Sequence, residues 1–261
     1  MKITIITCTY NSAKYLEKNI QSVEKQTYKN FEHIFIDGFS TDGTTDIIEK
    51  YQHGHSDKVF FYKLTPKGIS NAMNEGIKKA TGKYLIHLHS DDYFFDNYVL
   101  QDLINFLEKN NYPDWIYGKI NVLKDYESIG IYPNKKLFKL KKRGRFFKKF
   151  ILKIHNFIPH QSVFIKKEVF KKFGYFDENL KTFMDFDMWI RIKNKTNFIF
   201  FDRIISNYTI RKDAQSSGLK NKECNNKELN MIRKKYLNIF DLIVLFFIKL
   251  LLIFKKNNYQ K

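Results

Sequence analysis

Two adjacent carboxylates, Asp91 and Asp92, directly follow a short apolar run in this sequence. The run from Tyr84 to Leu88 is typical of a strand buried on both faces of a sheet. Neighbouring acids repel each other unless a cation or a donor neutralises them, and open α/β sheets bind ligands at the carboxyl ends of their strands. The pattern predicts a divalent metal site that holds a phosphate. The alternative is an acidic turn that opens the helix expected near Asp96.

Polar residues also follow the first two predicted strands. Residues 2–7 and 31–36 are rich in β-branched and aromatic side chains, which favours strands. The first is followed by Thr9 and Tyr10, and the second by Asp37. Right-handed crossovers bring such strand ends to one edge of the sheet. The spacing therefore predicts a single cleft that holds an aromatic ring and three carboxylates.

The elements that position these residues alternate as β-α-β-α-β-α-β with short connections, which predicts an α/β, doubly wound sheet. Two further strands are expected at 59–64 and 84–88, and helices are expected after a cap at Asn11 or Ser12, at 44–51 and at 68–79. No GxGxxG follows the first strand and no GxxxxGK[ST] loop occurs. Dinucleotide-binding proteins and P-loop phosphotransferases are therefore disfavoured.

The length of 261 residues suits one large domain, or one domain with a tail. Cys8 and Cys224 lie far apart and make no metal or redox spacing, which indicates a reducing compartment. Met1 to Cys8 is itself a predicted strand, so we expect no signal peptide.

The net charge of +19 calls for an anionic partner. Residues 135–153 contain ten Lys and Arg residues and no acid, interleaved with Leu, Phe and Ile. This mixture suits an anionic membrane interface; the alternative is a solvated basic loop. No nucleic-acid-binding motif occurs, so we expect no nucleic acid partner.

Residues 239–256 form a second membrane-directed segment, strongly apolar but interrupted by Asp241 and Lys249. A membrane-spanning helix needs about 20 apolar residues. The segment instead predicts a helix that lies in the membrane interface. The alternative is a terminal helix packed on the domain or on a partner.

Seven motifs, taken in order, resemble family 2 glycosyltransferases of GT-A fold, most of all the small bacterial enzymes of surface polysaccharide synthesis. The motifs are TCTYN at 7–11, IDGFSTDGT at 36–44, KGISNAMNEGI at 67–77 with ATGKYL at 80–85, HSDD at 89–92, DWIYG at 114–118, PHQSVFIKKEVFKKFGYFDENL at 159–180 and MDFDMWIRI at 184–192. The resemblance covers about residues 1–210. It implies a GT-A-like mixed sheet with a nucleotide-sugar-binding half at 1–120, an acceptor half at 121–215 and a helical C-terminal tail at 216–261.

The resemblance also implies a set of residues that bind the nucleotide sugar. Tyr10 would stack on the base and Asp37 would accept a base N–H, roles that suit an aromatic face and a carboxylate. The same set includes Thr9, Asn11, Lys67, Asn71 and Asp91. At Asn71 relatives usually carry Asp, which leaves the identity of the donor sugar open.

The acidic pair corresponds to the metal-binding motif of the family. Asp92 is expected to be the direct ligand, and Asp91 a further ligand or a contact to the ribose or sugar. Mg²⁺ or Mn²⁺ is expected, because these cations take few carboxylates plus phosphate oxygens. His89 stands where relatives commonly have Asn, and we expect it to pack.

The general base is expected at the start of a helix with the pattern acid-x-acid-x-Trp-x-Arg. Here Asp185 takes that role, because displacement with inversion needs a group that removes the proton of the acceptor hydroxyl. Asp187 faces another side of the helix, where it would cap the helix or orient its neighbours. The alternative is that both acids only favour the N-terminus of the helix. The resemblance further implies a set of residues near the acceptor or the diphosphate: His160, Gln161, Asp187, Trp189 and Arg191.

These expectations combine into a metal-dependent, inverting glycosyltransferase at the cytoplasmic face of the cell membrane. It would move a sugar from a nucleotide sugar, a UDP-sugar by preference, to a glycan or lipid-linked saccharide. One alternative is a nucleotidyltransferase on a similar fold, which would need a glycine-rich phosphate loop that TCTYN does not supply. Another is a catalytically silent binding protein of the same fold, which the intact carboxylates argue against.

Overall fold

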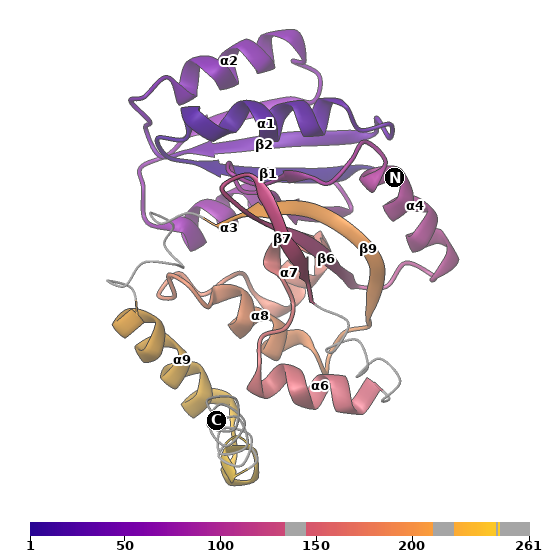
Figure 1. Ribbon diagram of the computed structural model, residues 1–261, viewed down its shortest axis with the longest axis vertical. Coiled ribbons are helices and arrows are strands. Elements are labelled where there is room, and N and C mark those ends of the chain that lie inside the picture. The colour runs from indigo at the N-terminus through magenta and orange to yellow at the C-terminus, as the bar shows by residue number, and fades with distance from the viewer. Residues whose placement is uncertain (134–144, 211–221, 244, 246–261) are drawn as a thin grey trace.

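The computed structural model describes residues 1–133, 145–210, 222–243 and 245 (Figure 1). The strands are β1 Ile3–Thr9, β2 Phe31–Asp37, β3 Val59–Lys63, β4 Tyr84–His87, β5 Tyr93–Phe94, β6 Trp115–Lys124, β7 Glu127–Tyr132, β8 Val163–Lys166 and β9 Phe198–Thr209. The helices are α1 Ala13–Glu24, α2 Thr44–Gly54, α3 Ile69–Lys79, α4 Val99–Lys109, α6 Arg145–Ile154, α7 Lys167–Phe173, α8 Met184–Ile192 and α9 Lys222–Tyr236, with a 3₁₀ turn at His160–Ser162. Much of the predicted basic segment (135–144) and most of the predicted apolar tail (244, 246–256) lie outside the described residues.

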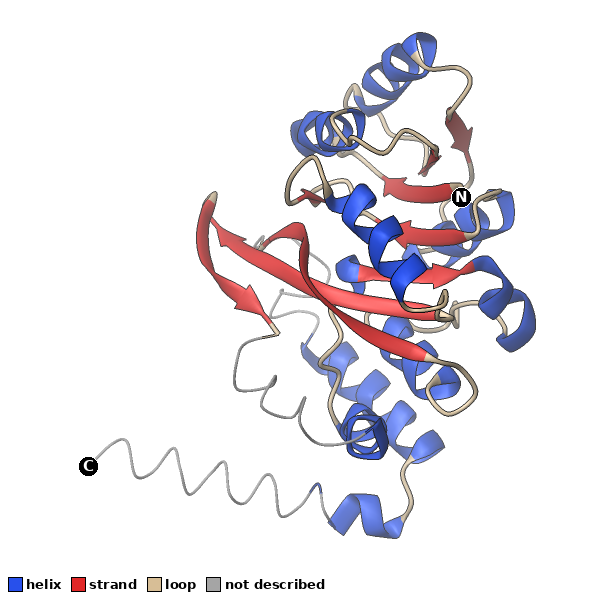
Figure 2. Cartoon of the chain, turned by 90° about the vertical axis from the view of Figure 1, so that its right-hand side faces the viewer, coloured by secondary structure: helices blue, strands red, loops and turns tan. Residues whose placement is uncertain are grey.

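One mixed sheet organises the described chain, in the order β3-β2-β1-β4-β8-β6-β9-β5, with β7 paired to β6. Strands β1 to β4 are parallel, whereas β8 runs antiparallel to both β4 and β6. Figure 2 shows the strands twisting strongly from one end of the sheet to the other. The predicted α/β class and mixed sheet are therefore confirmed. The division of the chain into two halves near residue 120 stays a prediction.

Helices cover both faces of the sheet, as the apolar stripes of the sequence require. On one face, α3, α7 and α8 share a buried cluster that includes Met73, Phe170 and Trp189. On the other face, α4 buries Leu103 in a second cluster, and α1 packs with α2 in a third. The carboxyl ends of β1, β2 and β4 are left uncovered between these layers.

The first strand shows why the parallel part of the sheet forms where it does. All seven residues of β1 are buried, and most of them are β-branched, which suits a strand with helices on both sides. Helix α3 lies close against it at Gly76, where an added Cβ would come within 2.4 Å of Ile6 Cγ2. A side chain at that position would push the helix away from the sheet.

The start of α1 differs from the expected cap. Ser12 occupies the N-cap position, but its side chain makes no capping hydrogen bond in the described structure. Instead, Asp42 Oδ2 accepts from the Ala13 N–H at 3.0 Å, while Asp42 Oδ1 accepts from the Thr44 N–H at 3.1 Å. A carboxylate from the loop after β2 thus caps both α1 and α2 and ties the first two loops together.

Candidate active site

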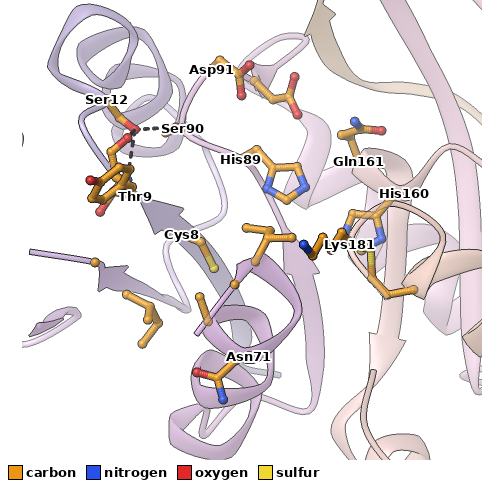
Figure 3. A pocket seen from close by; sticks show the side chains of 18 of the residues that line it. Cys8, Thr9, Ser12, Asn71, His89, Ser90, Asp91, His160, Gln161 and Lys181 are labelled. Carbon is orange, nitrogen blue, oxygen red and sulfur yellow. Dashed lines mark hydrogen bonds between the residues drawn. The ribbon is translucent and has the colours of Figure 1, made fainter. Parts of the chain in front are cut away.

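A pocket of about 880 Å³ opens at the carboxyl ends of β1, β2 and β4 (Figure 3). Predicted site residues from both ends of the sequence line it: Thr9, Tyr10, Asn11, Asp37, Lys67, Asn71, Asp91, Asp92, His160, Gln161 and Asp185. The far wall comes from β6, β7 and β9, through Ile120, Val122, Tyr132 and Tyr208. Sequence neighbours alone would not reveal this grouping, because it joins strand ends that the sheet topology brings together.

Asp37 forms a fixed, buried corner of the pocket. Its carboxylate accepts from Thr9 Oγ at 2.8 Å, from Ser40 Oγ at 2.6 Å and from the Ser40 N–H at 2.8 Å. Asn11 stabilises the same corner, since its Oδ1 accepts from the Thr41 N–H at 2.9 Å. These contacts hold the Asp37 oxygens in one orientation at the wall of the pocket.

Tyr10 supplies the aromatic ring at the mouth of the pocket. Its side chain is 64% exposed. The ring lies over Gly38, where an added Cβ would come within 3.2 Å of Tyr10 Cδ2 and 3.5 Å of Pro66 Cβ. Because Gly38 has no side chain, the Tyr10 ring fits beside the buried carboxylate of Asp37. An aromatic ring next to a carboxylate is suited to binding a nucleobase.

The acidic loop after β4 is held from α1. Asp92 is buried and Asp91 is half-buried. The amide of Asn19, fully buried on α1, donates to the carbonyl oxygens of His89 at 2.9 Å and of Asp92 at 3.0 Å. The sequence reasoning did not single out Asn19. The available signal was a polar residue between the apolar positions Leu16 and Ile20 of the same helix.

The donor set at this loop fits a hard divalent cation that also binds a ligand. No group of three or more His, Cys, Asp or Glu side chains gathers around a metal position in the described ranges. The pocket thus offers Asp91 and Asp92 as carboxylate ligands, with the other positions open to phosphate oxygens and water. Mg²⁺ and Mn²⁺ are commonly held in this way, by one or two carboxylates plus substrate phosphates.

Two histidine rings, His89 and His160, line the pocket, and a third, His87, is buried next to them. His89 stacks on His160, with ring centroids 5.5 Å apart, and His87 lies 5.4 Å from His160. Figure 3 shows His89 near the centre of the pocket, between Asp91 and Lys181 in this view. Burial lowers the pKa of His87 to about 3 and that of His160 well below its ordinary value. These two rings are therefore neutral at physiological pH.

Asp185 lies in the first turn of α8 and faces the same pocket. Its Oδ2 accepts from the side-chain amide of Asn156 at 3.2 Å. Burial raises the pKa of Asp185 to about 6. A carboxylate whose pKa lies close to neutrality is suited to general base catalysis. Asn156 was not found from the sequence, since it precedes Asp185 by 29 residues and belongs to no motif.

The other predicted residues of this helix do not line the pocket. Asp187 is buried and accepts from Lys235 Nζ at 2.9 Å. Trp189 stacks on Trp115, with ring centroids 5.1 Å apart. Arg191 donates from its guanidinium to the carbonyl oxygens of Phe173, at the end of α7, and Tyr175. These three side chains fix α8 in place and are not among the residues that line the pocket. Their contact with an acceptor or diphosphate stays a prediction.

Two lysines and one amide also line the pocket. Lys67 lies at the pocket as expected, and Lys181, which the sequence reasoning missed, joins it. Asn71 donates to Glu178 Oε2 at 3.0 Å, so its own carbonyl oxygen is left to accept from a ligand.

Comparison with known families decides the classification. The family described as Glycosyl transferase family 2 matches residues 4–174. The chain belongs to glycosyl transferase family 2. The match ends before α8, so the place of Asp185 in the site depends on the geometry described above.

Relatives of this family 2 chain include an uncharacterized glycosyltransferase of Rickettsia typhi, 31% identical over 215 residues. That alignment covers 82% of this chain and 65% of the relative, so the chain spans just under two thirds of its length.

Solved structures support the GT-A fold. Staphylococcus aureus TarS in complex with UDP-GlcNAc matches with a TM-score of 0.66 and 24% identity, over 82% of this chain and 60% of TarS. The mannosyltransferase of Pyrobaculum calidifontis in complex with GDP-Man and Mn²⁺ matches with a TM-score of 0.60 and 18% identity, over 81% and 58%. At these identities the likeness concerns the fold.

Proposed function

We propose that this protein is a metal-dependent, inverting glycosyltransferase that moves a sugar from a nucleotide sugar to a hydroxyl of a saccharide acceptor. The observation that carries the proposal is the shared pocket. Asp91 and Asp92, suited to a cation and a diphosphate, and Asp185, suited to proton removal, line one cavity of about 880 Å³. A cavity of that size is large enough for a sugar nucleotide.

The proposed reaction uses Asp185 as the base. Its carboxylate takes the proton of the acceptor hydroxyl while that oxygen attacks the anomeric carbon of the donor. The bond between the anomeric carbon and the diphosphate oxygen breaks on the opposite face, and its electron pair stays on the diphosphate. The configuration at the anomeric carbon is thereby inverted.

Residues across the pocket hold the leaving group. Asp92 would bind the cation directly, and Asp91 would contribute a second ligand or a contact to the donor's ribose or sugar. When bound, Mn²⁺ or Mg²⁺ supplies positive charge that stabilises the departing diphosphate. Lys67 and Lys181 line the same space and would add positive charge at the phosphates.

The corner formed by Tyr10 and Asp37, where we place the nucleobase, favours a UDP-sugar as the donor. Tyr10 offers an exposed ring at the pocket mouth, and Asp37 offers a fixed carboxylate acceptor for a base N–H. TarS, a structural neighbour, is described in complex with UDP-GlcNAc. Thr9 and Asn11 support this corner from the loop after β1.

The acceptor is proposed to be a growing, lipid-linked glycan at the cytoplasmic face of the membrane. After α9 the chain exposes Ile239, Phe240 and Ile243, while Asp241 is buried and pairs with Lys153 of α6. Lys153 and Asp241 belong to described parts of the two segments, 135–153 and 239–256, that are predicted to contact an anionic membrane. No helix in the described ranges is long and apolar enough to cross a membrane.

A panel of nucleotide sugars tests the proposed function. UDP-GlcNAc, UDP-glucose, UDP-galactose and GDP-mannose are each added with MnCl₂, with MgCl₂ or with EDTA, and the midpoint of thermal unfolding is measured. We expect at least one donor to raise the midpoint with a metal and not with EDTA, because a ligand of the native state stabilises it. The same donor should release its nucleotide slowly by hydrolysis. Binding of no donor under any condition would refute the proposal.

Membrane association has a separate test. The full chain should sediment with vesicles that contain anionic phosphatidylglycerol, and a chain that ends at residue 238 should not. Equal sedimentation of the two proteins would refute the role of residues 239–256 and leave the proposed chemistry untouched.

A further inference from the structure

The loop that leads into α8 is bound by a buried carboxylate from α9. Glu228 is only 5% exposed, although it belongs to a helix near the end of the described chain. Its Oε1 accepts from the Lys181 N–H at 2.7 Å, and its Oε2 accepts from the N–H groups of Thr182 at 3.0 Å and Phe183 at 3.1 Å. Three consecutive backbone donors therefore share one carboxylate.

These three donors lie directly before the helix that carries Asp185. The N-cap residue of α8 is Phe183, whose side chain has no oxygen with which to cap the helix. Glu228 accepts from the N–H groups of this residue and of the two before it, so it holds the chain where it enters α8. Its negative charge at this place also interacts favourably with the positive end of the helix dipole.

A second contact joins the same two helices one turn further on. Asp187 Oδ1 accepts from Lys235 Nζ at 2.9 Å and from the Tyr236 hydroxyl at 2.8 Å, both at the end of α9. Figure 1 shows α9 lying beside α8 on the side of the molecule away from α1 and α2. Helix α9 is therefore bound to the first turn of α8 at two points, with Asp185 between them in the sequence.

The opposite end of the loop is bound to α3. Ser70 Oγ donates to the Leu180 carbonyl at 2.6 Å, and the Asn74 side chain donates to the Phe176 carbonyl at 3.0 Å. The loop thus runs from the pocket side of α3 to α9 with its backbone groups bound on both sides. Loss of the hydrogen bonds to Glu228 would free only the end of the loop that continues into α8 and Asp185.

We propose that Glu228 is a positioning residue, which holds the start of α8 so that Asp185 faces the acceptor side of the pocket. This inference rests on the proposed function, in which Asp185 is the base. Glu228 does not line the pocket. It acts through the backbone of residues 181–183, and a small displacement of a reacting group is enough to slow a reaction about 100-fold.

The test compares Glu228→Ala and Glu228→Gln with Glu223→Ala. Glu223 lies on the same helix and pairs with Lys227 at the surface, which makes it a matched control. Amide hydrogen exchange is measured on the full chain without ligand. In Glu228→Ala the amides of residues 181–183 should exchange faster, and so should the Asp187 N–H, which donates to the Phe183 carbonyl in the first turn of α8. Glu223→Ala should leave both unchanged.

Activity supplies the second readout. UDP with MnCl₂ is titrated by calorimetry to count competent donor sites, and nucleotide release is measured across the same four-donor panel. Glu228→Ala should lower kcat per competent site by about 10- to 100-fold with little change in donor KM. Glu228→Gln, which keeps an acceptor oxygen for the loop, should recover part of that loss. If the rate of nucleotide release falls only in proportion to the number of competent donor sites, the positioning role is refuted.

Asp185→Asn, measured in parallel, separates this proposal from the proposed function. If Asp185→Asn is inactive and Glu228→Ala turns over at the wild-type rate with normal exchange at the Asp187 N–H, only the positioning role of Glu228 is refuted. If Asp185→Asn keeps the wild-type rate, Asp185 is not the base, and the proposed function fails at that step.

Discussion

The two sides of the pocket are built in different ways. On the donor side, Asp37 takes its hydrogen bonds from Thr9, at the end of the neighbouring strand, and from Ser40, three residues further along the chain. On the other side, Asp185 is held by Asn156, and its helix is bound by Glu228, which is 45 to 47 residues from the amides it accepts from. One side follows from the sheet and its local loops, and the other from contacts between distant segments.

This difference also concerns electrostatics. The Asp37 carboxylate accepts three hydrogen bonds of 2.6 to 2.8 Å, which hold its oxygens in place. Asp185 accepts from the Phe186 N–H at 2.6 Å and from the Asn156 amide at 3.2 Å, yet burial raises its pKa to about 6. The proposed donor side is therefore suited to rigid recognition. The side of Asp185 is suited to proton transfer, which needs a carboxylate whose pKa lies close to neutral pH.

The largest effect is expected from Asp185→Asn, which removes the base and keeps the shape of the side chain. We expect kcat to fall by about 10²- to 10⁴-fold, while the affinity for UDP with MnCl₂, measured by calorimetry, stays at the wild-type value. Asp46→Asn is the control, because Asp46 is an exposed acid in the first turn of α2. Loss of UDP affinity in Asp185→Asn would move this residue to the donor side.

Asp37→Ala tests the other side of the comparison. The change leaves the Thr9 hydroxyl and the Ser40 hydroxyl and N–H without their acceptor. It also removes the acceptor that is proposed to bind an N–H of the nucleobase. A lost partner of this kind costs about 1–3 kcal/mol, or roughly 5- to 150-fold in affinity. We expect weaker UDP binding by calorimetry and a lower unfolding midpoint. Unchanged UDP affinity with a lower midpoint would show that Asp37 only stabilises the loop.

The sequence predicted which residues meet at the strand-end edge of the pocket, because that edge depends on local rules, and their role in binding a donor stays a prediction. β-branched runs fix the strands, parallel crossovers place their ends together, and the polar residues at those ends, such as Tyr10 and Asp91, then share one edge. Even here, the cap of α1 was misassigned, because Asp42 reaches back from the next loop to the Ala13 N–H. That contact depends on how close the two loops lie, which spacing alone does not specify.

The base side was predicted only in part. The position of Asp185 in the pocket agrees with its place in the motif. However, Asn156 and Glu228 carry no local signal, since a single Asn or Glu is common on any surface. Their roles arise from burial and from the backbone groups they meet after folding. Trp189 and Arg191 differ from Asp185, because they share its motif but contact other parts of the protein and do not line the pocket.

Asn156→Ala should sharpen the electrostatic contrast. The amide of Asn156 lowers the pKa of Asp185 and so opposes the effect of burial. Without this hydrogen bond, the pKa of Asp185 should rise above about 6. As the pH is lowered, kcat should therefore begin to fall at a higher pH than in the wild type. The loss of one hydrogen bond predicts about a 2- to 10-fold lower kcat at neutral pH. An unchanged pH profile, measured by nucleotide release, would contradict this coupling, and Asn179→Ala, at an exposed position, is the control.

The smallest expected effect is on stability. Because the folded-state pKa of Asp185, about 6, lies above its ordinary value of 3.8, the folded protein binds this proton more tightly than the unfolded chain. Ionised Asp185 therefore lowers stability above pH 6, and this penalty disappears as the pH falls from 6 towards 4. The unfolding midpoint of Asp185→Asn relative to the wild type, measured with EDTA and without donor, should accordingly be higher at pH 8 than at pH 4. A difference that does not depend on pH would mean that the site stabilises the ionised carboxylate of Asp185 as well as water does, and would contradict the raised pKa of Asp185.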